Sequence, residues 1–95
     1  MAVKILVKRS VSAENAEALK TLINELRVLT TGQQGYISGE TLKRVDAPDQ
    51  SLVISKWQSA EAWKRWLQDE RRERIQQQID RLLKAPTEYE IYEYD

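Results

Sequence analysis

The chain has 95 residues with fifteen basic and fifteen acidic side chains, and it contains neither cysteine nor histidine. A chain this short forms one domain, residues 1–95, and buries only about 60% of the surface that its unfolded form exposes. The composition excludes disulfides, thiolate metal sites and histidine chemistry. The balanced charge provides no broad attraction for nucleic acid or for anionic lipid.

The N-terminal residues 2–8 have the pattern of a strand. Val3, Ile5 and Val7 share one parity, and Leu6 has the other, which is the period of an extended chain. Charged residues interrupt the apolar stretch, so it resembles neither a signal sequence nor a membrane span. We therefore expect a cytoplasmic protein that has neither a membrane nor a nucleic acid as its partner.

A helix and a hairpin are expected next. Apolar residues recur at three- and four-residue intervals from Ala16 to Leu29, which predicts a helix over about 13–30 with Ser12 as its N-cap. Residues 36–45 and 51–57 have the composition of strands, although Gly39 weakens the first of them. The short turn between them makes the pair an antiparallel hairpin.

The second helical region carries two apolar stripes. One is centred on Trp63 and the other on Ile75, and at about 100° per residue they lie well over 90° apart around the helix axis. The residues between them, 69–74, are all charged. This pattern predicts two helices with a break near 68–71. Residues 88–94 then alternate as a final strand.

The order strand–helix–strand–strand–helix–strand predicts a ferredoxin-like α+β domain, βαββαβ, with a four-stranded antiparallel sheet and helices on one face. Both faces of the sheet would be apolar, because Leu6 lies opposite Val7 and Leu52 opposite Val53. Which parity faces the helices stays open. The uncovered face would expose on the order of several hundred Å² of apolar surface, so we expect a homodimer formed through that face.

The segment WQSAEAWKRW, Trp57–Trp66, resembles the signature of the antibiotic-biosynthesis-monooxygenase family, in which a tryptophan ends the third strand before a serine cap, Glu-Ala and an aromatic residue. The Gly35-Tyr36 step and the element order over the whole chain are also similar. The resemblance implies a dimeric α+β barrel with a pocket between sheet and helices. Family members include enzymes that oxygenate quinol- or anthrone-type aromatics without metal or flavin, and relatives that degrade haem.

The chain departs from this family at several positions. Trp66 stands where many relatives have histidine, although haem-degrading relatives also have tryptophan there, and residues 69–72 replace a Ser-Pro-His-Phe-like stretch. Gln76 occupies the position of the axial histidine of the haem-degrading relatives, and glutamine is a poor iron ligand. The resemblance therefore implies a cofactor-independent monooxygenase for a small aromatic molecule, with no metal and no cofactor, rather than a haem-degrading enzyme.

Two other functions stay open. The absence of histidine also fits a non-catalytic ligand-binding or stress-associated dimer that has lost its reactive groups. A purely structural assembly module would have a filled core and no pocket. The candidate substrate-binding residues are Trp66, Trp63, Tyr36 and Gln76. Core packing is the alternative role of the three aromatic residues, as buried tryptophan usually anchors a core, and an exposed position is the alternative for Gln76. No general base can be chosen, so the catalytic residues stay unknown.

Overall fold

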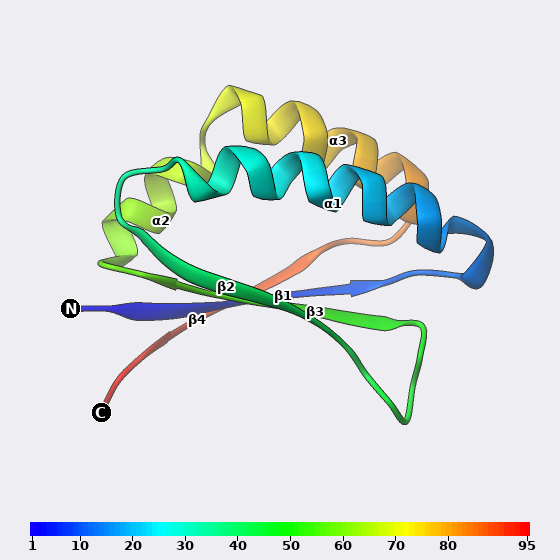
Figure 1. Cartoon of the computed structure of the whole chain (residues 1–95), viewed down its shortest axis with the longest axis horizontal. Helices are drawn as coiled ribbons and strands as arrows, with labels where there is room; N and C mark the ends of the chain where they lie inside the picture. Colours follow the sequence, from blue (N-terminus) through cyan, green and yellow to red (C-terminus); the bar gives the residue numbers. More distant parts are fainter.

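Four strands form one antiparallel sheet in the order β2-β3-β1-β4, in a computed structural model that describes all 95 residues. In chain order the elements are β1 (Val3–Ser10), a short 3₁₀ turn (Ala13–Asn15), α1 (Ala16–Thr31), β2 (Tyr36–Lys43), β3 (Gln50–Trp57), α2 (Ala60–Leu67), α3 (Glu70–Leu83) and β4 (Glu88–Glu93). All three helices lie on one face of the sheet (Figure 1). The predicted ferredoxin-like α+β fold is confirmed.

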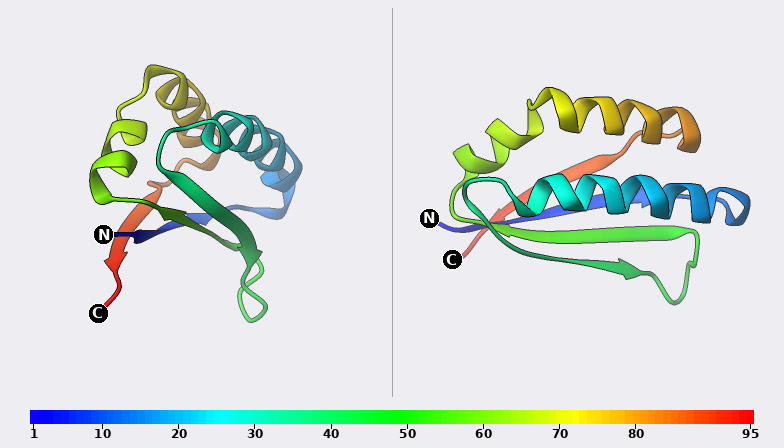
Figure 2. Two further views of the ribbon diagram at one scale, coloured as in Figure 1. Left: turned by 60° about the vertical axis from the view of Figure 1, so that its left-hand side comes forward. Right: turned by 45° about the horizontal axis from the view of Figure 1, so that its top comes forward.

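The long helices α1 and α3 run side by side over the sheet, and the short helix α2 lies at one end of it (Figures 1 and 2). Their apolar sides cover one parity of each central strand. Val3, Ile5 and Val7 are at most 6% exposed beneath the helices, whereas Leu6 on the other parity is only half-buried. The fold therefore settles which parity of β1 faces the helices.

The predicted break in the second helical region is present between α2 and α3. The side chain of Asp69 accepts a hydrogen bond from the Arg71 amide, 2.8 Å away, and so caps the start of α3. Ser59 Oγ likewise accepts from the Ala62 amide at 3.1 Å, so the serine of the WQSAEAWKRW segment is the cap of α2. Ser12 differs from the prediction, because its side chain makes no capping hydrogen bond and the helix begins as a 3₁₀ turn.

Gly35 sets the distance between the start of β2 and helix α2. Its φ is +91°, and a Cβ atom there would lie 2.5 Å from the Cβ of Ala62. Its carbonyl accepts a hydrogen bond from the Gln58 amide at 2.7 Å. Because only glycine tolerates both the positive φ and this close approach, the Gly35-Tyr36 step has a structural cause.

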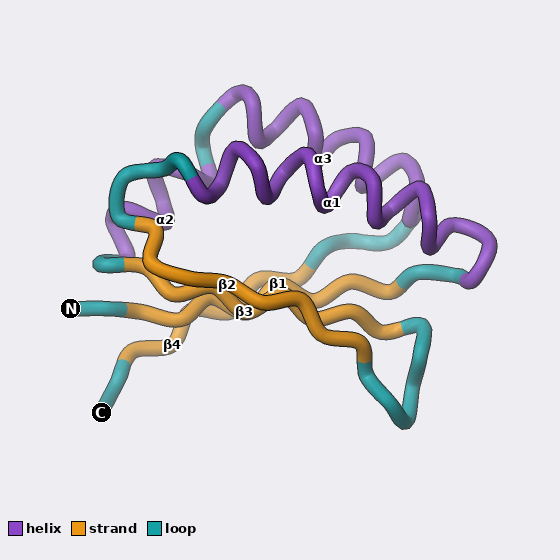
Figure 3. Tube along the Cα trace, viewed as in Figure 1, coloured by secondary structure: helices purple, strands orange, loops and turns teal.

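The face of the sheet away from the helices, here called the open sheet face, is turned downward in Figure 3, opposite the helices. Its apolar members are Leu6, Leu42, Leu52 and Ile54, and cross-strand pairing places Leu6 beside Ile54 and Leu42 beside Leu52. A 3.0 Å salt bridge between Lys8 and Glu90 flanks this apolar group. No helix has both the length and the hydrophobicity needed to cross a membrane.

Candidate functional site

A cavity of about 70 Å³ lies between the inner face of the sheet and the helices. Its exposed lining residues, Arg27, Gly39, Glu40 and Thr41, mark a mouth between α1 and β2. A water molecule needs roughly 10–15 Å³ of such volume and takes about 30 Å³ in the liquid. The cavity therefore has room for about five waters, which is comparable to one six-membered ring with its immediate substituents.

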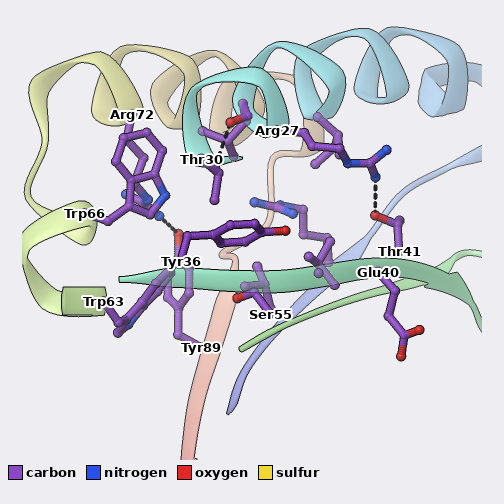
Figure 4. Close-up of a pocket in the computed structure, with 16 residues that line it drawn as sticks. Arg27, Thr30, Tyr36, Glu40, Thr41, Ser55, Trp63, Trp66, Arg72 and Tyr89 are labelled. Carbon is purple, nitrogen blue, oxygen red and sulfur yellow. Dashed lines mark hydrogen bonds between the residues drawn. The ribbon is translucent and has the colours of Figure 1, made fainter. Parts of the chain in front are cut away.

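Aromatic side chains form the inner end of the cavity. Tyr36, Trp63, Trp66 and Tyr89 line it, and Figure 4 shows these rings gathered at the end away from Arg27. The ring centroids of Trp63 and Tyr89 are 5.9 Å apart, and Trp63 also packs against Trp57 at 5.7 Å. Such a surface suits a flat aromatic guest, since ring faces and edges pair favourably at these distances.

Three of the four predicted binding residues, Trp66, Trp63 and Tyr36, are thus brought together around one cavity. Trp57 is fully buried, and its indole N–H donates to Ser55 Oγ at 3.0 Å, so its role is structural. The structure also explains why β2 contains Gly39, the residue predicted to weaken this strand. A Cβ atom on Gly39 would lie 2.7 Å from the Tyr36 hydroxyl, so glycine makes the space that the Tyr36 phenol occupies.

Gln76 is placed differently. It is 8% exposed, which corrects the expectation that it lies at the surface, and it does not line the cavity. Its Oε1 accepts from Arg9 Nη2 at 3.3 Å, and its Nε2 donates to Asp80 and to Thr87, each at 2.9 Å. The side chain is buried because these three partners satisfy its amide. No ligating atom at this position therefore faces the cavity, and the site does not fit haem.

Two buried arginines line the cavity, and sequence reasoning missed both. Arg9 and Arg72 are each 4% exposed. Arg72 donates to the Leu67 carbonyl at 3.2 Å and to the Tyr89 hydroxyl, and its guanidinium lies 5.9 Å from the centre of the Trp63 ring. Arg72 is thereby held against the aromatic wall, partly through cation–π attraction.

Arg9 lies at the inner face because it shares the parity of Val3, Ile5 and Val7. Burial lowers its pKa to about 10, since the charged form loses hydration. It is therefore still protonated at neutral pH. The only hydrogen bond of its guanidinium is the one to Gln76, and its Nε has no partner. The parity of Arg9 was the signal in the sequence that could have identified it.

Few groups near the cavity could accept a proton. Glu40 is the only carboxylate among the lining residues. It pairs across the sheet with Ile54 and directs its carboxylate away from the aromatic rings (Figure 4). No group of three or more acidic side chains is arranged to hold a metal ion. The chemistry available in the cavity is therefore that of aromatic surfaces, hydroxyls and guanidinium groups.

Fold and cavity together define a class: ferredoxin-like α+β domains that enclose an aromatic-walled cavity between sheet and helices. The sequence profile described as antibiotic biosynthesis monooxygenase matches residues 2–78. The chain belongs to the antibiotic biosynthesis monooxygenase family. No curated protein matches its sequence.

Several solved structures share this fold. A conserved protein from Methanosarcina mazei Go1 has a TM-score of 0.92 at 18% identity, over 100% of this chain and 94% of that one. Rv0793 from Mycobacterium tuberculosis gives 0.88 at 15% identity, over 100% and 96%. SnoaB, a cofactor-independent oxygenase from Streptomyces nogalater, gives 0.82 at 17% identity, over 99% and 93%. At these identities the likeness concerns the fold alone.

Proposed function

We propose that this chain is a cofactor-independent monooxygenase acting on a small aromatic molecule, quinol- or anthrone-like. The observation that carries the proposal is the cavity lined by Tyr36, Trp63, Trp66 and Tyr89, in a domain of the antibiotic biosynthesis monooxygenase family. The cavity volume of about 70 Å³ admits one ring. Further rings of a larger substrate would extend through the mouth beside Arg27.

The substrate itself supplies all the electrons for this reaction. A quinol reacts with dioxygen so that one oxygen atom enters the ring and the other leaves as water, and the quinol becomes a hydroxyquinone. The role of the chain is then to hold the ring between Tyr36 and Trp66 and to exclude bulk water from it. No side chain needs to bond covalently to the substrate.

The test of this function is oxygen uptake with a panel of anthrones and of quinols that have a single ring. We expect consumption above the buffer rate for at least one quinol, and its loss in Trp66→Ala, which removes one of the aromatic rings that line the inner wall. Gln77→Ala is the matched control, because Gln77 is exposed on α3 and does not line the cavity. Rates equal to the buffer rate across the whole panel would contradict the proposal.

A second candidate is a non-catalytic ligand-binding dimer. It is favoured by the absence of any carboxylate directed into the cavity, since Glu40 points away (Figure 4). This candidate predicts that the cavity binds quinols, as measured by quenching of the fluorescence of Trp63 and Trp66, without oxygen uptake. Binding together with uptake would instead support the oxygenase.

We also propose that two copies of the chain pair through the open sheet face. Leu6, Leu52 and Ile54 are apolar there, and each is only half-buried in the single chain. Lys8 and Glu90, which flank them, carry opposite charges and could also pair across a twofold axis. An identical sheet would remove this apolar surface from water, which supports a homodimer over a monomer.

A further inference from the structure

Two buried side-chain polar atoms in the chain have no hydrogen-bond partner, Arg9 Nε and Trp63 Nε1. Both belong to residues that line the cavity. Native proteins satisfy nearly all buried donors, and a buried guanidinium is among the least tolerant of missing partners. Because both unpaired donors lie in the wall of the same cavity, an oxygen atom of a bound ligand is indicated as the acceptor that the protein lacks.

The charge around Arg9 is not balanced by the protein. The charged and titratable groups that face it are Arg72 and Asp80 from α3 and Tyr89 from β4. Asp80 does not touch the guanidinium, because Gln76 lies between them and contacts both. A purely structural arginine would be expected to contact a carboxylate directly or to use several of its five donors.

The remaining charges at the cavity do not cancel Arg9 either. Arg72 adds a second positive charge deep in the wall, and the exposed Arg27 at the mouth donates to the Thr41 hydroxyl at 2.6 Å. Glu40, the only lining carboxylate, is directed to the other side of the sheet (Figure 4). The cavity is thus lined by three guanidinium groups, with no anionic group directed into it.

We propose that the cavity binds its aromatic ligand as an oxyanion, a phenolate or enolate, with Arg9 as the counter-charge and the Trp63 indole N–H as a second donor. This inference rests on the proposed function, because it names the form in which a quinol- or anthrone-like substrate is bound. It also removes the need for a general base in the protein. A ligand hydroxyl near Arg9 ionises more readily, and its proton passes to bulk water at the mouth.

The probe for this test is 4-nitrophenol, a single-ring phenol whose ionised form is yellow. We expect the bound probe to ionise roughly one to three pH units below the free probe, as an opposite charge in contact dictates. We also expect 4-nitroanisole, which has the same ring but cannot ionise, to bind at least about tenfold more weakly than the phenolate. Absorbance titration of the probe with and without protein measures both.

Variants assign the effect to Arg9. Arg9→Met keeps the length of the side chain and should fold, because an apolar replacement of a buried charge is often tolerated. It should abolish the shift in the ionisation of the probe, whereas Arg9→Lys should retain part of it. Trp63→Phe, which removes only the second donor and some ring area, should reduce the shift. Arg74→Met is the control, since it removes the same charge from an exposed position on α3.

The proposal is overturned by unshifted ionisation of the bound probe, by binding of 4-nitroanisole as tight as that of the phenolate, or by an unchanged shift in Arg9→Met. Failure of both probes to bind would also overturn it. The two proposals fail separately. If quinols are oxidised but the ionisation of the bound probe is not shifted, only the oxyanion proposal fails. If the ionisation is shifted but no oxygen is consumed, only the oxygenase proposal fails.

Discussion

Arg9 on β1 and Gln76 on α3 are joined by a buried 3.3 Å hydrogen bond, although they lie 67 positions apart in the sequence. The contact connects the inner face of the sheet to the helix layer beside the cavity. Gln76 also holds Asp80 and Thr87. A neutral amide therefore separates the nearest carboxylate from a buried cation, and the charge of Arg9 stays available to the cavity.

Exchanging the amide of Gln76 and the carboxylate of Asp80 should prevent the cavity from binding an anionic ligand without unfolding the chain. In the double variant Gln76→Glu/Asp80→Asn, the total charge is unchanged and a carboxylate contacts Arg9 directly. We expect the free energy of unfolding to change by less than about 1–2 kcal/mol, because the hydrogen bonds can re-form, while binding of 4-nitrophenolate falls at least about tenfold. Asp80→Asn alone is the control and should retain binding. Unaltered binding in the double variant would contradict the role assigned to Arg9.

Gly35→Ala should destabilise the chain strongly. The new Cβ would meet Ala62 Cβ at 2.5 Å, and φ is +91°. The positive φ costs about 1–2 kcal/mol and the overlap about 1–3 kcal/mol more. Gly32→Ala is the matched control, because its φ is −89° and its nearest contact is 3.7 Å. It should change stability by no more than about 1 kcal/mol. Denaturant unfolding of both variants measures this difference, and equal losses would refute the argument.

Gly39→Ala should act on the cavity through Tyr36. Its Cβ would lie 2.7 Å from the Tyr36 hydroxyl, so the phenol ring must move. We expect weaker quinol binding and a loss of roughly 1–3 kcal/mol in the free energy of unfolding. Tyr36→Phe removes the atom in conflict, so the double variant should recover most of that loss. Strictly additive losses in this double-mutant cycle would show that the two positions do not interact.

Asp69, the N-cap of α3, should make the stability of the chain depend on pH in the acid range. Hydrogen bonding to Arg71 lowers the pKa of Asp69 to about 2 from its ordinary value of 3.8. Because the folded pKa is the lower one, the stabilisation is complete above about pH 4 and is lost as the pH falls towards 2. Asp69→Asn keeps a capping oxygen but cannot ionise. The melting temperatures of the two proteins should therefore converge between pH 4 and pH 2, and a constant difference would count against the assignment.

The proposed dimer can be tested on the open sheet face. Leu6→Glu places a charge in the middle of the apolar group, opposite Ile54, and should convert the dimer into a monomer in sedimentation analysis. Val28→Glu is the control, since Val28 is 75% exposed on α1, on the helix side of the molecule. A wild-type chain that sediments as a monomer at micromolar concentration would remove the basis for the dimer.

Local patterns in the sequence determined the elements of this protein. The alternation around Val3, Ile5 and Val7, the Ser59 cap and the change of stripe between Trp63 and Ile75 each involve residues a few positions apart. Strand period, helix capping and stripe rotation are properties of neighbouring residues. The element order, the fold class and the break before α3 could therefore be predicted and were confirmed.

The candidate site depended on contacts that no local pattern records. Tyr36, Trp63 and Trp66 are aromatic residues in the segments that resemble the family, and packing brings them around one cavity. The sequence shows that Arg9 shares the parity of Val3, Ile5 and Val7, but only the tertiary structure shows that this parity is buried and that Gln76 is buried beside Arg9. The parity of β1 that faces the helices is decided where α1 and α3 cover the sheet. Pairing between residues 67 positions apart decides which polar groups are satisfied, and so which are left for a ligand.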